Sequence, residues 1–95
     1  MDTDKSPTVR VLFRVDRGDF QDVTAVFDDP DFEVSKDGYA VCYAHIGQHS
    51  ECSREWYNGT RAAKPSEYAP LLAELRQVYS DCRLIVGKRA AHAFR

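Results

Sequence analysis

Residues 42–52 (CYAHIGQHSEC) hold two of the three cysteines and two of the three histidines of the chain. Written as ligands, the segment is C-x2-H-x3-H-x2-C, and thiolates and imidazoles are the usual ligands of zinc. The same residue types form nucleophilic sites in which a histidine activates a cysteine. They also occur as structural residues where a strand meets a turn. The segment therefore admits three interpretations: a metal site, a catalytic thiol and a structural corner.

Local geometry limits the metal interpretation. In a strand, Cys42 and His45 point to opposite faces, and His45 and His49 share a face but lie about 13 Å apart. In a helix, Cys42 and Cys52 lie about 15 Å apart along the axis. Four-ligand coordination therefore requires an irregular backbone, and we predict no metal and no cofactor. The alternative is a zinc site that uses His45 and His49, completed by Cys42, Cys52, Cys82, His92 or a carboxylate.

A catalytic cysteine needs a base or a positive field that stabilises its thiolate. Cys52 lies three residues after His49 and two before Arg54, so both could lower its pKa, and Gln48 could orient a histidine. The sequence contains no glycine-rich phosphate loop, nucleophile elbow or HExxH motif. We therefore predict that the protein is not an enzyme, and we keep a Cys–His enzyme as a second alternative.

The stretch Ser53–Arg61 (SREWYNGTR) contains the only tryptophan, a tyrosine and two arginines. Trp, Tyr and Arg are the residues that most often anchor protein interfaces. Connections between regular elements commonly display binding residues. This stretch, the two histidines and an acidic run supply the predicted binding residues. They are Arg54, Trp56, Tyr57, Arg61, His45, Gln48, His49, Asp28, Asp29 and Asp31.

Charge is distributed unevenly along the chain. Between Asp16 and Asp37 there are eight acidic residues and only Arg17 and Lys36 as bases, whereas basic residues predominate after Ser53. Such a dipolar chain can steer a charged partner toward one end. The net charge of −2 does not favour direct nucleic-acid binding. The acidic run instead predicts a basic protein partner.

The spacing of apolar residues predicts the fold. Alternating or branched apolar residues predict strands over Thr8–Val15, Asp22–Phe27, Tyr39–Ile46 and Cys82–Val86. Apolar residues three and four apart predict an amphipathic helix over Pro65–Ser80. The predicted fold is α+β: a small antiparallel sheet of about four strands, in the order β-β-β-α-β, with one amphipathic helix packed on one face.

With 95 residues, the chain is long enough for one domain with a single core. We predict that this domain covers residues 8–89 and that residues 1–7 and 90–95 are flexible tails. The first seven residues are polar and acidic, unlike a signal peptide. No apolar run approaches the roughly 20 residues that a membrane-spanning helix needs. We therefore expect a cytoplasmic protein with no membrane partner.

Part of the sequence resembles a group of small phage- and prophage-encoded proteins. The resemblance covers residues 39–86 and is carried by HIGQHS at residues 45–50, Trp56-Tyr57, TRAA at residues 60–63, Glu67-Tyr68 and Glu74-Leu75. Pro70 and the acidic run depart from the group's pattern. The group has no established activity, so the resemblance implies a product of a bacterial host cell and no catalytic role.

Small proteins of this phage type often act by binding a host or defence protein. The resemblance, the interface-type residues and the uneven charge together predict protein–protein binding that modulates or inhibits such a factor. The partner could belong to a nucleic-acid-binding complex, and an anti-CRISPR-like inhibitor is one instance. In that case the acidic run would compete for a basic nucleic-acid channel.

Overall fold

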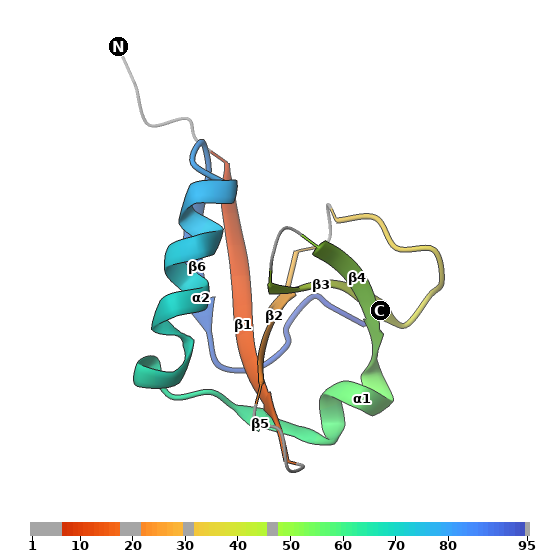
Figure 1. The fold of residues 1–95 in the computed structure, drawn as a ribbon. Helices are drawn as coiled ribbons and strands as arrows, with labels where there is room; N and C mark the ends of the chain where they lie inside the picture. Colours follow the sequence, from red (N-terminus) through yellow and green to blue (C-terminus); the bar gives the residue numbers. More distant parts are fainter. Residues whose placement is uncertain (1–6, 18–21, 30–31, 46–47, 95) are drawn as a thin grey trace.

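The computed structural model describes residues 7–17, 22–29, 32–45 and 48–94, apart from the side chains of His45 and Gln48. It has an α+β fold (Figure 1). The elements are β1 (Thr8–Asp16), β2 (Val23–Phe27), β3 (Tyr39–His45), β4 (Gln48–Ser53), α1 (Arg54–Asn58), β5 (Thr60–Ala62), α2 (Pro65–Val78) and β6 (Arg83–Gly87). Within the described part of the chain, no helix is long and apolar enough to cross a membrane.

The predicted α+β class is confirmed, and the sheet is larger than expected. The predicted strands correspond to β1, β2, β3 and β6, and the predicted helix to α2. The chain also forms β4, α1 and β5, in the region between the third predicted strand and the predicted helix where no regular element was expected. Gly38 immediately precedes β3 and adopts a φ of 84°, a left-handed conformation that glycine tolerates at little cost.

The strands follow the order β4-β3-β2-β1-β5, and β6 also pairs with β1. One edge of β1 is shared: residues Thr8–Leu12 pair with β6, and residues Arg14–Asp16 pair with β5. The β1–β6 pairing is parallel, whereas the other pairings are antiparallel. The expectation of a purely antiparallel sheet is therefore corrected at β6. Helix α2 connects β5, which runs antiparallel to β1, with β6, so the helix returns the chain to the start of β1, where β6 pairs in parallel.

Helix α2 covers one face of the sheet (Figure 1). Alternate residues of β1, namely Val9, Val11 and Phe13, pack in the same core cluster as Leu71 and Leu75 of the helix. This is the apolar face that the alternation in β1 and the stripe in α2 predict.

The opposite face of the sheet carries a second core. Leu12, Val26, Cys42 and Cys52 are buried there with Phe94, and residues of α1 pack against them. Burying a phenylalanine side chain contributes about 1.5–3 kcal/mol. The C-terminal residues 90–94, which were predicted to form part of a flexible tail, therefore lie packed on the sheet.

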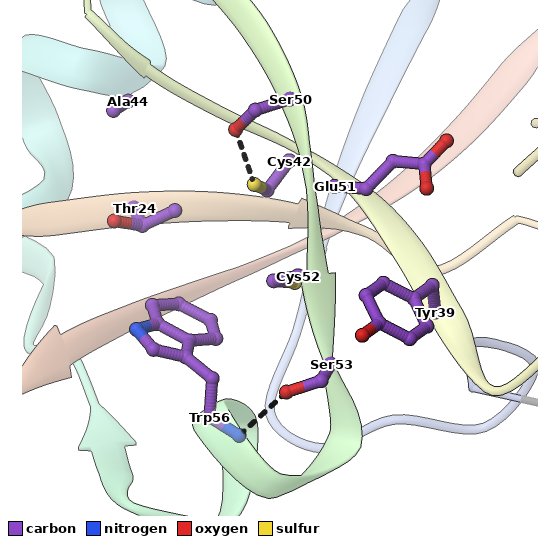
Figure 2. A pocket seen from close by; sticks show the side chains of 9 residues that line it. All are labelled: Thr24, Tyr39, Cys42, Ala44, Ser50, Glu51, Cys52, Ser53 and Trp56. Carbon is purple, nitrogen blue, oxygen red and sulfur yellow. Dashed lines mark hydrogen bonds between the residues drawn. The ribbon is translucent and has the colours of Figure 1, made fainter. Parts of the chain in front are cut away.

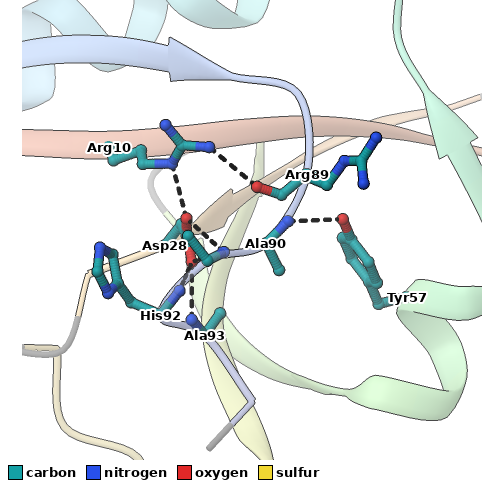
Figure 3. A network of polar contacts seen from close by, with 8 residues as sticks. Arg10, Asp28, Tyr57, Arg89, Ala90, His92 and Ala93 are labelled. Carbon is teal, nitrogen blue, oxygen red and sulfur yellow. Dashed lines mark hydrogen bonds and ion pairs between the residues drawn. The ribbon is translucent and has the colours of Figure 1, made fainter.

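The buried Asp28 carboxylate holds this C-terminal segment (Figure 3). It accepts hydrogen bonds from the backbone N–H groups of Ala91, His92 and Ala93, at 2.7–3.1 Å. It also accepts one from Arg10 Nε at 2.7 Å. Every oxygen is thus compensated, which explains how a carboxylate with 1% exposure is tolerated.

Candidate functional site

The two histidines of residues 42–52 lie on the paired strands β3 and β4. Tyr43 pairs with His49 and His45 pairs with Gln48, with a register shift between Tyr43 and His45. Residues 46 and 47 and the side chains of His45 and Gln48 lie outside the described part of the structure. The structural corner that was one of the three interpretations of this segment thus lies partly outside the described residues.

His49 and the two cysteines lie on opposite faces of this hairpin. His49 is on the α2 face, where its Nε2 lies 2.6 Å from the hydroxyl of Tyr79 and its ring is 4.9 Å from the ring of Tyr43. Cys42 and Cys52 belong to the core of the other face. Among the described residues no group of three or more His, Cys, Asp or Glu side chains could hold a metal ion. The zinc alternative that combines His49 with either cysteine thus lacks a shared face.

The predicted binding residues between Ser53 and Arg61 lie in different environments. The Tyr57 hydroxyl accepts a hydrogen bond from the backbone of Ala90, and the tyrosine ring lies 4.3 Å from the Arg14 guanidinium. Arg61 forms a bidentate pair with Glu67 at 2.8 and 2.9 Å. These two predicted binding residues are therefore engaged within the fold. Arg54 is exposed at the start of α1, and Trp56 lines a pocket.

The predicted acidic run is also divided. Asp28 is buried and is an internal hydrogen-bond acceptor, so its assignment to an accessible acidic surface is corrected. Asp29 is half-buried, and Asp31 lies outside the described residues. Glu33 and Asp37 are exposed on the loop between β2 and β3.

The Glu51 carboxylate connects this acidic loop to β4. It accepts hydrogen bonds from the Ser35 backbone N–H at 2.9 Å and from the Ser35 hydroxyl at 2.8 Å. Glu51 itself is exposed. The contact holds Ser35, which lies between Glu33 and Asp37 in the loop, against Glu51 of β4.

A pocket of about 400 Å³ lies between β2, β3, β4 and α1 (Figure 2). Such a volume is within the range of small-ligand sites, about 300–1,000 Å³. Its lining mixes aromatic, thiol and hydroxyl groups. The lining residues are Thr24, Tyr39, Cys42, Ala44, Ser50, Glu51, Cys52, Ser53 and Trp56.

Helix α1 positions Trp56 at this pocket. Ser53 is the N-cap residue, and its hydroxyl accepts a hydrogen bond from the backbone N–H of Trp56 at 3.1 Å. Serine is among the favoured N-cap residues because its oxygen satisfies an otherwise unpaired N–H group. The helix ends at Gly59, whose N–H donates to the carbonyls of Glu55 and Trp56. Both ends of this five-residue helix are thus closed locally, and the helix carries Trp56 at the pocket.

Strand register places both cysteines on the pocket side. Cys42 pairs with Ser50, and Ala40 pairs with Cys52. The cysteines are therefore diagonal neighbours on the same face, one on each strand. Both side chains are buried, with residue exposures of 5% and 8%. The Sγ atom of Cys42 lies 3.1 Å from the Ser50 hydroxyl oxygen.

The three thiols have different pKa values because their surroundings differ. The neighbouring Cys52 thiol and the Ser50 hydroxyl stabilise the Cys42 thiolate against burial and the Glu51 charge, which lowers the pKa of Cys42 to about 6. The same Cys42 neighbour and burial raise the pKa of Cys52. Burial and the adjacent Asp81 carboxylate raise the pKa of Cys82. Cys42 is therefore the thiol that ionises first.

The sequence singled out Trp56 and the two cysteines but did not show that they line one pocket. That arrangement depends on β4, a polar strand whose pairing with β3 brings Cys42 opposite Ser50. Ser53 followed by Glu55 is a helix-start signal that could have located α1. No family model, curated protein or solved structure compared with the chain matches it.

Proposed function

We propose that this protein acts by binding an extended, basic segment of another protein along β4. An apolar side chain of that segment would occupy the pocket that Trp56 lines (the Trp56 pocket). The observation that carries the proposal is the position of the pocket beside a strand at the end of the sheet. Exposed sheet edges bind extended peptides through backbone hydrogen bonds, and adjacent pockets select side chains.

The edge of β4 supports this mode of binding. In the strand order β4 is terminal, and among the described residues β3 is its pairing partner. Its outer backbone groups are therefore available to a further strand. Its side chains at residues 48–51 are Gln, His, Ser and Glu, a polar set that limits non-specific association.

The pocket supplies the apolar part of the interaction. Trp56 and Tyr39 contribute aromatic surface, and Cys42 and Cys52 contribute small, polarisable side chains. A tryptophan at the centre of a binding patch is a frequent source of binding energy. We expect one aliphatic or aromatic side chain of the partner to contact Trp56.

Charge indicates the partner's chemistry. Glu51 lies on β4, and the exposed Glu33 and Asp37 are each two residues from Ser35, which hydrogen-bonds to Glu51. Lysine and arginine in the bound segment would therefore be favoured. Asp28 is excluded from this surface by its burial. An acidic rim of this kind could also engage the basic channel of a nucleic-acid-binding complex.

The biological setting of this proposal comes from the resemblance to small phage-encoded proteins. The protein would act in the cytoplasm of a bacterial host, on a host or defence factor, and an anti-CRISPR-like inhibitor is one instance. A partner of this type carries basic segments where it handles nucleic acid, which agrees with the acidic rim of β4.

Selection from a displayed library of random ten-residue peptides tests the binding mode. We expect enriched peptides to combine lysine or arginine with a central apolar residue. The Trp56→Ala variant should lose most of the captured peptides, whereas the control Ile85→Ala, an exposed apolar residue on β6, should retain them. Equal capture by Trp56→Ala and the wild type, or enrichment of acidic peptides, would contradict the proposal.

A further inference from the structure

The thiols of the Trp56 pocket differ in their surroundings from the third cysteine. Cys42 is buried, with 5% exposure, and it contributes to the lining of the pocket. The Ser50 hydroxyl, 3.1 Å away, can donate a hydrogen bond to a Cys42 thiolate. The Cys82 sulfur instead lies 3.8 Å from a carboxylate oxygen of Asp81, which disfavours a thiolate there.

We infer that Cys42 is a modification site at which a small soluble disulfide enters the Trp56 pocket and exchanges onto the thiol. The inference rests on the proposed function in one respect: the adduct fills the pocket and reduces peptide binding at β4. The modification itself depends on the geometry of Cys42 alone.

The exchange is balanced without a further oxidant. The Cys42 thiolate attacks one sulfur of the small disulfide, and a new S–S bond forms between that sulfur and Sγ. The old S–S bond breaks, and its electron pair stays on the departing sulfur as a thiolate. The proton that Cys42 released to solvent is available to this leaving group. One disulfide is consumed and one mixed disulfide is formed.

The position of Cys52 favours persistence of the mixed disulfide. Diagonal neighbours on adjacent antiparallel strands have Cα atoms about 7–8 Å apart. A direct disulfide requires Cα atoms about 4.4–6.8 Å apart. This typical backbone spacing disfavours a Cys42–Cys52 disulfide, although the two thiols are near enough for Cys52 to stabilise the Cys42 thiolate. The pocket, at about 400 Å³, can hold a small thiol attached to Cys42.

Peptide mapping of the wild-type protein tests the site without any substitution. The probe is 2-hydroxyethyl disulfide, a small neutral compound, applied briefly at pH 7. We expect one mixed disulfide, on Cys42, although Cys82 is the more exposed of the two residues. First modification of Cys82, no modification of Cys42, or a Cys42–Cys52 disulfide as the product would overturn the inference.

Variants of the protein distinguish adduct formation on Cys42 from its effect on peptide binding. Cys82→Ser should leave the adduct yield unchanged, and Ser50→Ala should slow formation of the Cys42 adduct several-fold. The adduct should also reduce capture of the selected peptides at least tenfold, and a reducing agent should restore capture. Full capture by the adduct would overturn the effect on binding. If the unmodified protein selects no peptides, the binding proposal fails and the mapping result alone decides the reactive thiol.

Discussion

The Asp28 carboxylate lies 2.7 Å from the backbone nitrogen of His92, 64 residues later in the chain. Together with the N–H groups of Ala91 and Ala93 and with Arg10, this contact fixes the C-terminal segment on the sheet. Residues 90–94 then close the core that Phe94 enters from the face opposite α2. Asp28 is therefore a structural residue of the second core.

Replacement of Asp28 by Asn should destabilise the fold. The neutral amide weakens the contact with Arg10 and turns one acceptor atom into a donor that faces backbone N–H groups. Hydrogen bonds to charged groups contribute about 1.5–3 kcal/mol each, so we expect the free energy of unfolding to fall by about 3 kcal/mol. Urea denaturation measures the change. Asp37→Asn, at an exposed position, is the matched control, and equal effects of the two variants would contradict this role.

Stability should also depend on Asp28 in acid. Burial raises the pKa of Asp28, but the N–H groups of His92, Ala93 and Ala91 and the Arg10 side chain outweigh it, so the pKa lies below its usual value. Because the unfolded-state pKa is about 3.9, the contribution is complete above about pH 5 and is lost as pH falls through the lower folded-state pKa. Urea denaturation at several pH values between 7 and 3 should show a smaller loss for Asp28→Asn than for the wild type. Parallel pH profiles would contradict the assignment.

Removal of the α1 cap should loosen Trp56. Substitution of Ser53 by Ala deletes the acceptor of the Trp56 N–H group, which typically costs about 1 kcal/mol. Since Trp56 is the only tryptophan, its fluorescence reports on this helix alone. We expect stronger quenching by acrylamide in Ser53→Ala than in the wild type. Ser66→Ala, at an exposed position of α2, serves as the control and should leave quenching unchanged.

The reactivity of Cys42 should follow its own ionisation. Because Cys52 and Ser50 lower the pKa of Cys42, its thiolate forms at lower pH than that of an ordinary thiol, which ionises near about pH 8.5. Alkylation by iodoacetamide, resolved by peptide mapping, should therefore reach half its maximal rate at lower pH at Cys42 than at Cys82. A Cys42 profile with its midpoint above pH 8 would contradict the stabilisation of its thiolate by Cys52 and Ser50.

The sequence predicted the elements whose apolar residues repeat regularly. The alternation in β1 and the stripe in α2 located both elements and the faces that they bury. Strand β4 was missed because its residues are polar, which is common at a sheet edge and gives no alternating signal. Helix α1 has five residues, too few for a helical period to appear.

Long-range polar contacts account for the remaining differences between the predictions from sequence and the structure. The burial of Asp28 depends on N–H groups more than 60 residues away, so its local sequence indicated only a member of an acidic run. Tyr57 and Arg61 looked like interface residues, but each has a partner within the fold. Only the strand register reveals that Cys42, Cys52 and Trp56 share a pocket.

The most direct test of the binding surface is an amide chemical-shift titration of the ¹⁵N-labelled protein with a selected basic peptide. We expect the largest shifts at the backbone amides of β4 (Gln48–Ser53) and at the Trp56 indole N–H. Amides of α2 and β6 should change little. The largest shifts on α2 or on the β6 edge, with the Trp56 indole unchanged, would contradict peptide binding at β4.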